Sequence, residues 1–165
     1  MKHFFTIALF FCIALCSAQI KFEITPQGLL PLELNTPNRP IDQLIELSKA
    51  WAPYYNKVGY DVSDVTQNSL TIDGRVENAF YSYNVGVKYN YDIRYSLKIQ
   101  FTENQKYTIR ISVKEIYAEN VLTKTTLTDF FTAEGKLKDD FRDAKPSLEN
   151  TINKILNSYT NFINQ

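Results

Sequence analysis

The feature that most constrains the fold is an alternation of apolar and polar residues from Asn68 to Tyr117. In YDIRYSLKIQF, residues 91–101, every second side chain from Ile93 onward is apolar, and KYTIRISV, residues 106–113, repeats the pattern. Successive side chains of a strand point to opposite faces, so this period of two predicts half-buried strands. We therefore expect an antiparallel sheet with one dry face and one wet face.

Two earlier runs extend the predicted sheet. Residues 69–76 place Leu70, Ile72, Gly74 and Val76 on the dry side. Residues 81–89 alternate in the same way and place on one shared face Tyr81, Tyr83, Val85, Val87 and Tyr89. We interpret the three tyrosines as strand-forming aromatics that cover a sheet surface, with a stacking platform for sugars as the alternative.

Two segments follow a helical period instead. Residues 39–57 predict a helix with Pro40 at its first position, because a proline lacks only an N–H that is unpaired there. Pro53 should end or kink it. Trp51 is expected to be a large core residue at the end of this helix, with ligand stacking as the alternative. The expected buried residues of this helix are Ile41, Leu44, Ile45, Ser48, and Trp51 or Ala52.

A second helix is expected to begin near Pro146, after an irregular charged segment. Its apolar stripe comprises Leu148, Ile152, Ile155, Leu156, Tyr159 and Ile163. Two amphipathic helices and one half-wet sheet predict a two-layer α+β domain, with both helices packed on the dry face of an antiparallel sheet.

The N-terminus, MKHFFTIALFFCIALCSAQ, has the build of a secretory signal peptide. Its apolar run is shorter than the roughly 20 residues that a membrane-spanning helix needs. Small residues before Gln19 predict cleavage after Ala18. Leu15 precedes Cys16 where a lipoprotein signal requires a small residue, so lipidation of Cys16 is the less favoured alternative. The sequence predicts an exported protein, periplasmic or secreted.

Residues 1–18 are thus the expected signal peptide, and residues 19–38 a lead-in or edge strand. Within the lead-in, IKFEI (residues 20–24) is a possible strand. The three prolines that follow, at positions 26, 31 and 37, favour an edge strand or a wrapping arm over a central strand. Residues 39–165 are expected to form a single α+β domain, which is long enough for its own core.

The order of these elements resembles an exported bacterial family described as a domain of unknown function with a TBP-like fold. The resemblance covers roughly residues 20–163. It rests on a helix with a late tryptophan (LIELSKAWAPYY), a DGR strand, a tyrosine-rich region, the hairpin YSLKIQFTENQKYTIRISVKEIY and the terminal helix. It implies a curved antiparallel sheet backed by helices and no established activity. The nucleic-acid function of the fold's namesake does not carry over, because export and the nearly neutral charge both argue against it.

Cleavage would remove both cysteines and the only histidine, His3. The mature chain then lacks the residues for a Ser-His-Asp triad, a Cys-His pair or the usual zinc sites. Its glycines match neither a phosphate loop nor a dinucleotide fingerprint, so we expect no cofactor. Its nearly neutral charge gives no electrostatic reason to bind nucleic acid or an anionic membrane.

Carboxylate chemistry remains available. The densest acidic group is Asp139, Asp140 and Asp143, which a hydrolase or a calcium site could use. Lysines and arginines are interleaved with these aspartates, and the calcium-loop spacing is absent. A solvated segment that balances its own charge is the better interpretation, and we predict no metal site.

The wet face of the second hairpin carries the sharpest positive signal. If Ile99 faces Ile109, the dry faces of the two strands coincide and residues 103–105 form a three-residue loop. That register places Lys98 opposite Arg110 and Arg94 opposite Lys114. Like charges directly opposed are unfavourable, so something should compensate them.

Neighbouring acids, with Asp73 and Glu77 as candidates, are one source of compensation. The other is an anionic ligand or acidic partner laid across the four basic residues, because arginine binds carboxylates bidentately. We therefore expect a non-catalytic exported module that binds an unknown protein or anionic partner through the open sheet face. A carboxylate-based hydrolase and a purely structural envelope component are the alternatives. The candidate binding residues are Arg94, Lys98, Arg110 and Lys114.

Overall fold

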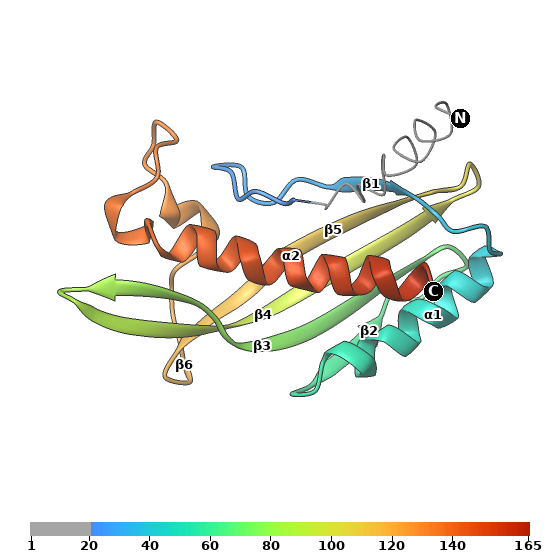
Figure 1. Cartoon of the computed structure of the whole chain (residues 1–165), viewed down its shortest axis with the longest axis horizontal. Coiled ribbons are helices and arrows are strands. Elements are labelled where there is room, and N and C mark those ends of the chain that lie inside the picture. The colour runs from blue at the N-terminus through green and yellow to red at the C-terminus, as the bar shows by residue number, and fades with distance from the viewer. Residues whose placement is uncertain (1–20) are drawn as a thin grey trace, which may run out of the picture.

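The structure is a computed structural model that describes residues 21–165, so the predicted signal peptide and Cys16 lie outside the described residues. One antiparallel sheet and two helices form two layers (Figure 1). The spatial order of the strands is β1-β5-β4-β3-β2, and β6 pairs with β5. The strands are β1 (Leu32–Asn35), β2 (Tyr60–Ser63), β3 (Ser69–Asn84), β4 (Val87–Thr102), β5 (Lys106–Ala118) and β6 (Val121–Leu122).

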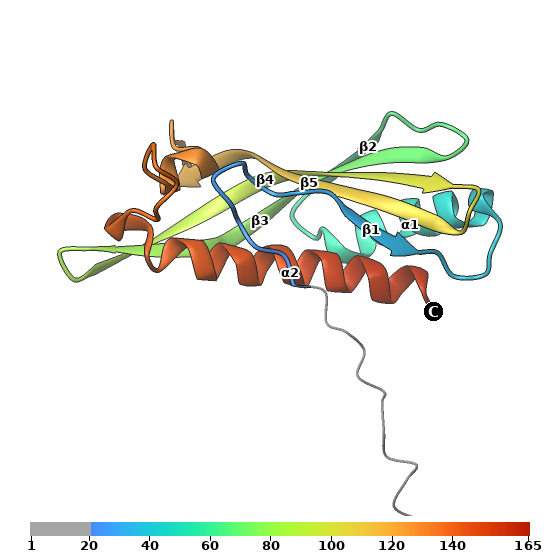
Figure 2. The same cartoon turned by 90° about the horizontal axis from the view of Figure 1, so that it is seen from above.

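The helices are α1 (Ile41–Tyr55) and α2 (Ala144–Ile163), and two 3-10 turns, η1 (Leu127–Phe130) and η2 (Asp139–Phe141), precede α2. Both helices lie on the same side of the curved sheet (Figure 2). This arrangement confirms the predicted two-layer α+β fold.

The dry face of the sheet follows the predicted alternation. Every second residue of β4 from Ile93 to Phe101 is buried, and the facing residues of β5, from Tyr107 to Ile111, are buried as well. These side chains form the floor of the core, and the helices cover it. The period of two therefore predicted the buried face of both strands correctly. Apolar residues at every second position all lie on one side of a strand, so only that side can be buried.

The helices bury the stripes predicted for them. In α1, Ile41 is half-buried and the other predicted residues are buried, and all six predicted residues of α2 are buried. Pro40 immediately precedes α1 instead of occupying its first position. Pro53 lies in the last turn, and α1 ends two residues later, as expected for a residue that cannot donate a backbone hydrogen bond.

Trp51 is fully buried where α1 meets α2, which confirms it as a core residue. Its ring stacks on the Tyr55 ring with the centroids 5.1 Å apart, and it meets the Tyr159 ring edge-on with the centroids 5.3 Å apart. The indole N–H donates to the Ser158 hydroxyl at 3.1 Å. The Tyr159 hydroxyl also pairs with the Ser48 hydroxyl at 2.9 Å. Stacking and satisfied polar groups together hold the two helices to each other.

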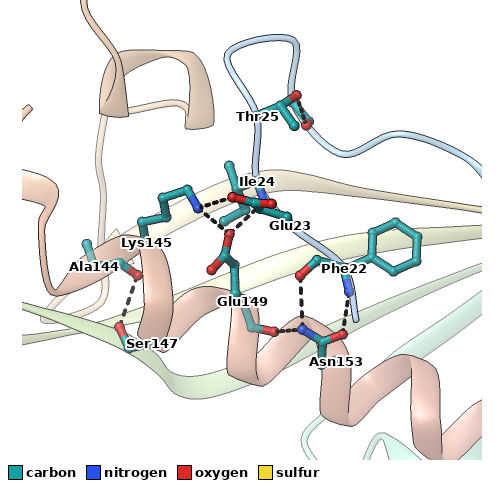
Figure 3. Close-up of polar contacts among 10 residues, drawn as sticks. Phe22, Glu23, Ile24, Thr25, Ala144, Lys145, Ser147, Glu149 and Asn153 are labelled. Carbon is teal, nitrogen blue, oxygen red and sulfur yellow. Dashed lines mark hydrogen bonds and ion pairs between the residues drawn. The ribbon is translucent and has the colours of Figure 1, made fainter. Parts of the chain in front are cut away.

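The N-terminal lead-in wraps across α2 (Figure 3). The Phe22 N–H donates to Asn153 Oδ1 at 2.7 Å, and Asn153 Nδ2 donates to the Phe22 carbonyl at 3.1 Å. The Ile24 N–H donates to Glu149 Oε1 at 2.8 Å. The strand predicted for IKFEI is therefore wrong over its described residues, 21–24. The backbone groups of Phe22 and Ile24 form hydrogen bonds with side chains of α2 instead of with a neighbouring strand.

The wrapping arm and the edge strand that the prolines favoured are both present. After the arm, β1 pairs with β5 as the edge strand of the sheet, with Leu32 opposite Ile109. Phe22 and Ile24 are buried, so the arm contributes to the core as well as to polar contacts. The lead-in is thus an integral part of the domain's packing.

The tyrosine-rich region differs from the prediction. Val85 and Gly86 form a two-residue turn, so Tyr83 lies opposite Lys88 and Tyr89 lies opposite Ser82. Tyr81 and Tyr83 therefore share one face of the hairpin, and Tyr89 belongs to the other. The predicted single aromatic face is wrong because residues on the two arms of a hairpin change phase at the turn.

Candidate functional site: the open face of the sheet

The candidate site lies on the face of the sheet opposite the helices, which no helix of residues 21–165 covers (Figure 2). Neighbouring strands align its side chains in rows. One row across β2, β3, β4 and β5 is Ser63, Thr71, Lys98 and Arg110. The next row is Asp61, Asp73, Ser96 and Ser112. Acidic groups thus lie on the β2–β3 side and basic groups on the β4–β5 side.

The predicted register of the β4–β5 hairpin is confirmed in its outer half. Ile99 pairs with Ile109, and Lys98 lies directly opposite Arg110. Thr102 and Lys106 close the expected three-residue loop. Both basic side chains are exposed, and neither forms an ion pair within the part of the chain that the structure describes. The like-charge pair is therefore not neutralised by direct contact.

The predicted pairing of Arg94 with Lys114 is wrong. A bulge lies between Arg94 and Tyr95, where Arg94 pairs with Glu115 and Tyr95 with Val113, so Lys114 becomes the extra residue of β5. Arg94 forms an ion pair with Glu115 at 3.3 Å. A bulge shifts the register by one residue, and here the shift replaces a like-charge pair with an opposite-charge pair.

The Glu115 carboxylate accepts hydrogen bonds from two residues. The Tyr117 hydroxyl donates to Glu115 Oε2, and Arg94 donates to the same oxygen. These hydrogen bonds lower the pKa of the Glu115 carboxyl, with that from Tyr117 as the larger cause. Arg94 is therefore compensated by a carboxylate, which separates it from the other three predicted basic residues.

A second like-charge pair, Arg75 opposite Arg94, was missed by the sequence reasoning. Arg75 donates to Asp92 at 2.8 Å and to the Asn120 side chain at 3.1 Å. Partial burial raises the pKa of Asp92, but the hydrogen bonds from Arg75 and the Asn78 N–H outweigh it and lower that pKa. Asp92 occupies a wet-face position of the alternation, which is the signal that could have identified it.

The acids proposed from sequence do not form the compensating ion pairs. Among residues 21–165, Asp73 and Glu77 make no ion pair, whereas Asp92 and Glu115 do. Within residues 21–165, Asp73 Oδ1 is buried without a hydrogen-bond partner. Sequence proximity on a neighbouring strand did not identify the partners, because the bulge at Arg94 and a register irregularity between Val76 and Phe80 decide which side chains meet.

A shallow depression of about 550 Å³ brings together three of the four predicted binding residues, Lys98, Arg110 and Lys114. Asp64 and Asp73 line it on the β2–β3 side, and Leu29 and Pro31 of the lead-in line it as well. The Thr71 hydroxyl donates to Asp64 Oδ2 at 3.1 Å. The depression therefore has a basic half and an acidic half within one surface.

The aspartates near α2 lie elsewhere. Asp139 pairs with Arg142 at 2.7 Å, and both side chains are largely exposed, as expected for a solvated segment that balances its own charge. No group of three or more potential metal ligands occurs within residues 21–165. In the same part of the chain, neither helix has the combination of length and apolar character needed to cross a bilayer.

Two solved structures share this architecture. A DUF4468 family protein from Bacteroides ovatus superposes with a TM-score of 0.59 at 8% identity, covering 91% of this chain and 92% of its own. A TBP-like protein from Parabacteroides distasonis gives a TM-score of 0.53 at 13% identity, covering 81% of this chain and 90% of its own. No protein-family model and no curated protein matches the sequence. The chain is similar in fold to a bacterial domain of unknown function and to a TBP-like protein, as the sequence predicted.

Proposed function

We propose that the mature chain is an exported, non-catalytic module that binds a protein or an anionic partner through the open face of its sheet. The observation that carries this proposal is the convergence of Lys98, Arg110 and Lys114 in one depression without an ion pair among the described residues. Arg94 is a weaker contributor, because Glu115 already compensates it.

Binding would relieve the repulsion between Lys98 and Arg110. A carboxylate or other anionic group placed between them gains attraction from both, and the guanidinium can hold it bidentately. The acidic half of the depression, at Asp64 and Asp73, would favour a partner that presents a negative group to the basic half and a positive group to the acidic half. The two halves together give the face a preferred orientation for its partner.

Export is the second part of the proposal, and mass spectrometry tests it. Protein recovered from the producing bacterium should have an intact mass that matches a first residue of Gln19. A mass that includes acyl chains on Cys16 would contradict simple cleavage and make the protein lipid-anchored.

The binding proposal can be tested with poly-L-glutamate as a defined acidic probe. The wild-type chain should bind it at low salt and release it at high salt, because exposed charges are screened over about 10 Å at moderate ionic strength. The double substitution Lys98→Gln/Arg110→Gln should weaken binding by roughly threefold to tenfold, the equivalent of one or two exposed ion pairs.

Lys154→Gln is the matched control, because Lys154 is an exposed lysine of α2 that makes no ion pair among the described residues. Its binding should equal that of the wild type. Binding that ignores salt, or that falls equally in the control and the double variant, would overturn the proposed site and favour the purely structural alternative.

A further inference from the structure

The end of the β3–β4 hairpin, residues 83–89, projects beyond the helical layer and is here named the hairpin tip (Figures 1 and 2). Its apolar side chains are unusually exposed. Val85 is 96% exposed, Val87 54%, Tyr83 50% and Tyr89 39%. Single exposed apolar residues are common on protein surfaces, but a group of four at the end of a projecting hairpin marks an interaction surface.

The turn contains a residue in an unfavourable backbone conformation. Val85 has φ of 48° and Gly86 has φ of 77°. A two-residue turn with both φ values positive is favoured by Asn-Gly or Asp-Gly, whereas a β-branched residue in this region is strained. The Val85 side chain lies almost wholly in solvent and gains no packing in return. An exposed, strained valine is better explained by a contact outside the chain.

The apolar side chains lie on both faces of the hairpin. Tyr83 lies opposite Lys88, and Tyr89 lies opposite Ser82, so the tyrosines stand at neighbouring levels on opposite sides. The two valines lie closer to the turn. The tip therefore has two valines at its end and, next to them, one tyrosine on each face.

The charge of the tip is equally distinctive. Residues 78–91 contain no acidic residue, and their single charged side chain is Lys88. The Lys88 ammonium group lies 4.3 Å from the centre of the Tyr81 ring. A lysine stem packed along an aromatic surface can keep its ammonium group at a polar boundary while apolar neighbours lie deeper.

We propose that the hairpin tip inserts reversibly into the interfacial layer of a lipid bilayer. A flat protein surface laid on the hairpin would cover one face, whereas a fluid apolar layer can surround both faces. Tyrosine is enriched at the boundary between headgroups and hydrocarbon, where its ring is buried and its hydroxyl remains hydrated. Lys88 would lie among the headgroups, and the two valines would enter the acyl region. This insertion uses a different end of the sheet from the basic depression and does not depend on the proposed function.

Flotation with phosphatidylcholine vesicles tests the insertion, with phosphatidylcholine–phosphatidylglycerol vesicles as a second arm. The wild-type chain should bind both kinds of vesicle, and anionic lipid should strengthen binding modestly through Lys88. Val85→Asp/Val87→Asp should reduce the vesicle partition coefficient about tenfold or more, because two apolar contacts are replaced by charges.

Val121→Asp is the matched control, because Val121 is 68% exposed on β6 and lies outside the tip. Its partition coefficient should stay within about twofold of the wild type. All variants share the same N-terminus, so differences between them report the tip alone. Equal losses in the control and the tip variant, or binding that requires anionic lipid and ignores the tip, would overturn the proposal.

Val85→Asn provides a second, independent readout. Asparagine suits the positive φ of the turn, so the melting temperature should rise, while vesicle binding should fall. A tip with only a structural role would show the first change without the second. Wild-type protein that binds no vesicles would overturn the insertion. So would loss of self-association in sedimentation as the only effect of the tip variants, because it would assign the tip to a second copy of the chain.

Discussion

The two faces of the β4–β5 hairpin share one backbone ladder but differ in what they contribute. On the dry face, Leu97 pairs with Ile111, and both side chains are buried in the core. On the open face, one residue along, Lys98 lies opposite Arg110 with both side chains in solvent. Burial stabilises the first face, while the second carries a small electrostatic penalty. Stability and the proposed binding therefore belong to opposite sides of the same strands, and substitutions should separate them.

The largest effect is expected at the helix layer on the dry side. Trp51→Ala should lower the free energy of unfolding by about 3–5 kcal/mol, because it empties a fully buried site between Tyr55 and Tyr159. Urea denaturation measures this loss. Near-normal stability combined with lost partner binding would show that Trp51 belongs to a site and would break the comparison between the two faces.

Gly74 tests how closely the dry side of β3 is packed. A Cβ atom there would lie 2.3 Å from Asn56 Oδ1 and 2.8 Å from the Tyr95 ring, whose hydroxyl donates to the same oxygen at 2.7 Å. Gly74→Ala should therefore lower the free energy of unfolding by about 1–3 kcal/mol through overpacking. Ser96→Ala, on the open face beside Tyr95, is the control and should change it by less than about 0.5 kcal/mol. Equal effects at both positions would contradict the assignment of faces.

The Arg75–Asp92 pair should be the most sensitive polar contact of the open face. Asp92→Asn removes the carboxylate that accepts from Arg75 and from the Asn78 N–H, and should lower the free energy of unfolding at neutral pH by about 1–2 kcal/mol. Because folding lowers the pKa of Asp92, its contribution is complete above the ordinary aspartate pKa and is lost as pH falls through the folded value. The variant should therefore lose less stability on acidification than the wild type. Parallel curves of stability against pH would refute this role.

The smallest effect is expected where the open face is repulsive. Lys98→Gln or Arg110→Gln should stabilise the free protein by a few tenths of a kcal/mol, because each removes one charge of an opposed pair. The gain should shrink at high salt. Thermal melts at two ionic strengths measure it, with Lys154→Gln as the reference. Clear destabilisation by either substitution would mean that unrecognised contacts compensate the pair.

The sequence by itself determined the dry face of the β4–β5 hairpin and its outer register. A one-residue slip between Ile99 and Ile109 would move the apolar residues of a whole strand into water, so the alternation excludes such a slip. The apolar pattern of α2 was equally informative. Its six predicted residues recur at helical spacing, so they lie on one side of the helix and can be buried together. The Lys98–Arg110 pair followed directly from that register.

Only the tertiary structure decided the partners of Arg75 and Arg94, the path of the lead-in and the split of the tyrosines. The bulge at Lys114 gives Arg94 a carboxylate partner, and the irregularity between Val76 and Phe80 places the Asn78 N–H on Asp92. Past Lys114 the buried positions of β5 change from odd to even numbers, but Ile116 alone is buried there, so the shift has little signal in the sequence. The arm likewise depends on Glu149 and Asn153, which lie more than a hundred residues away along the chain. Alternation reports which side of a strand is buried, whereas contacts between distant segments decide which charges are free.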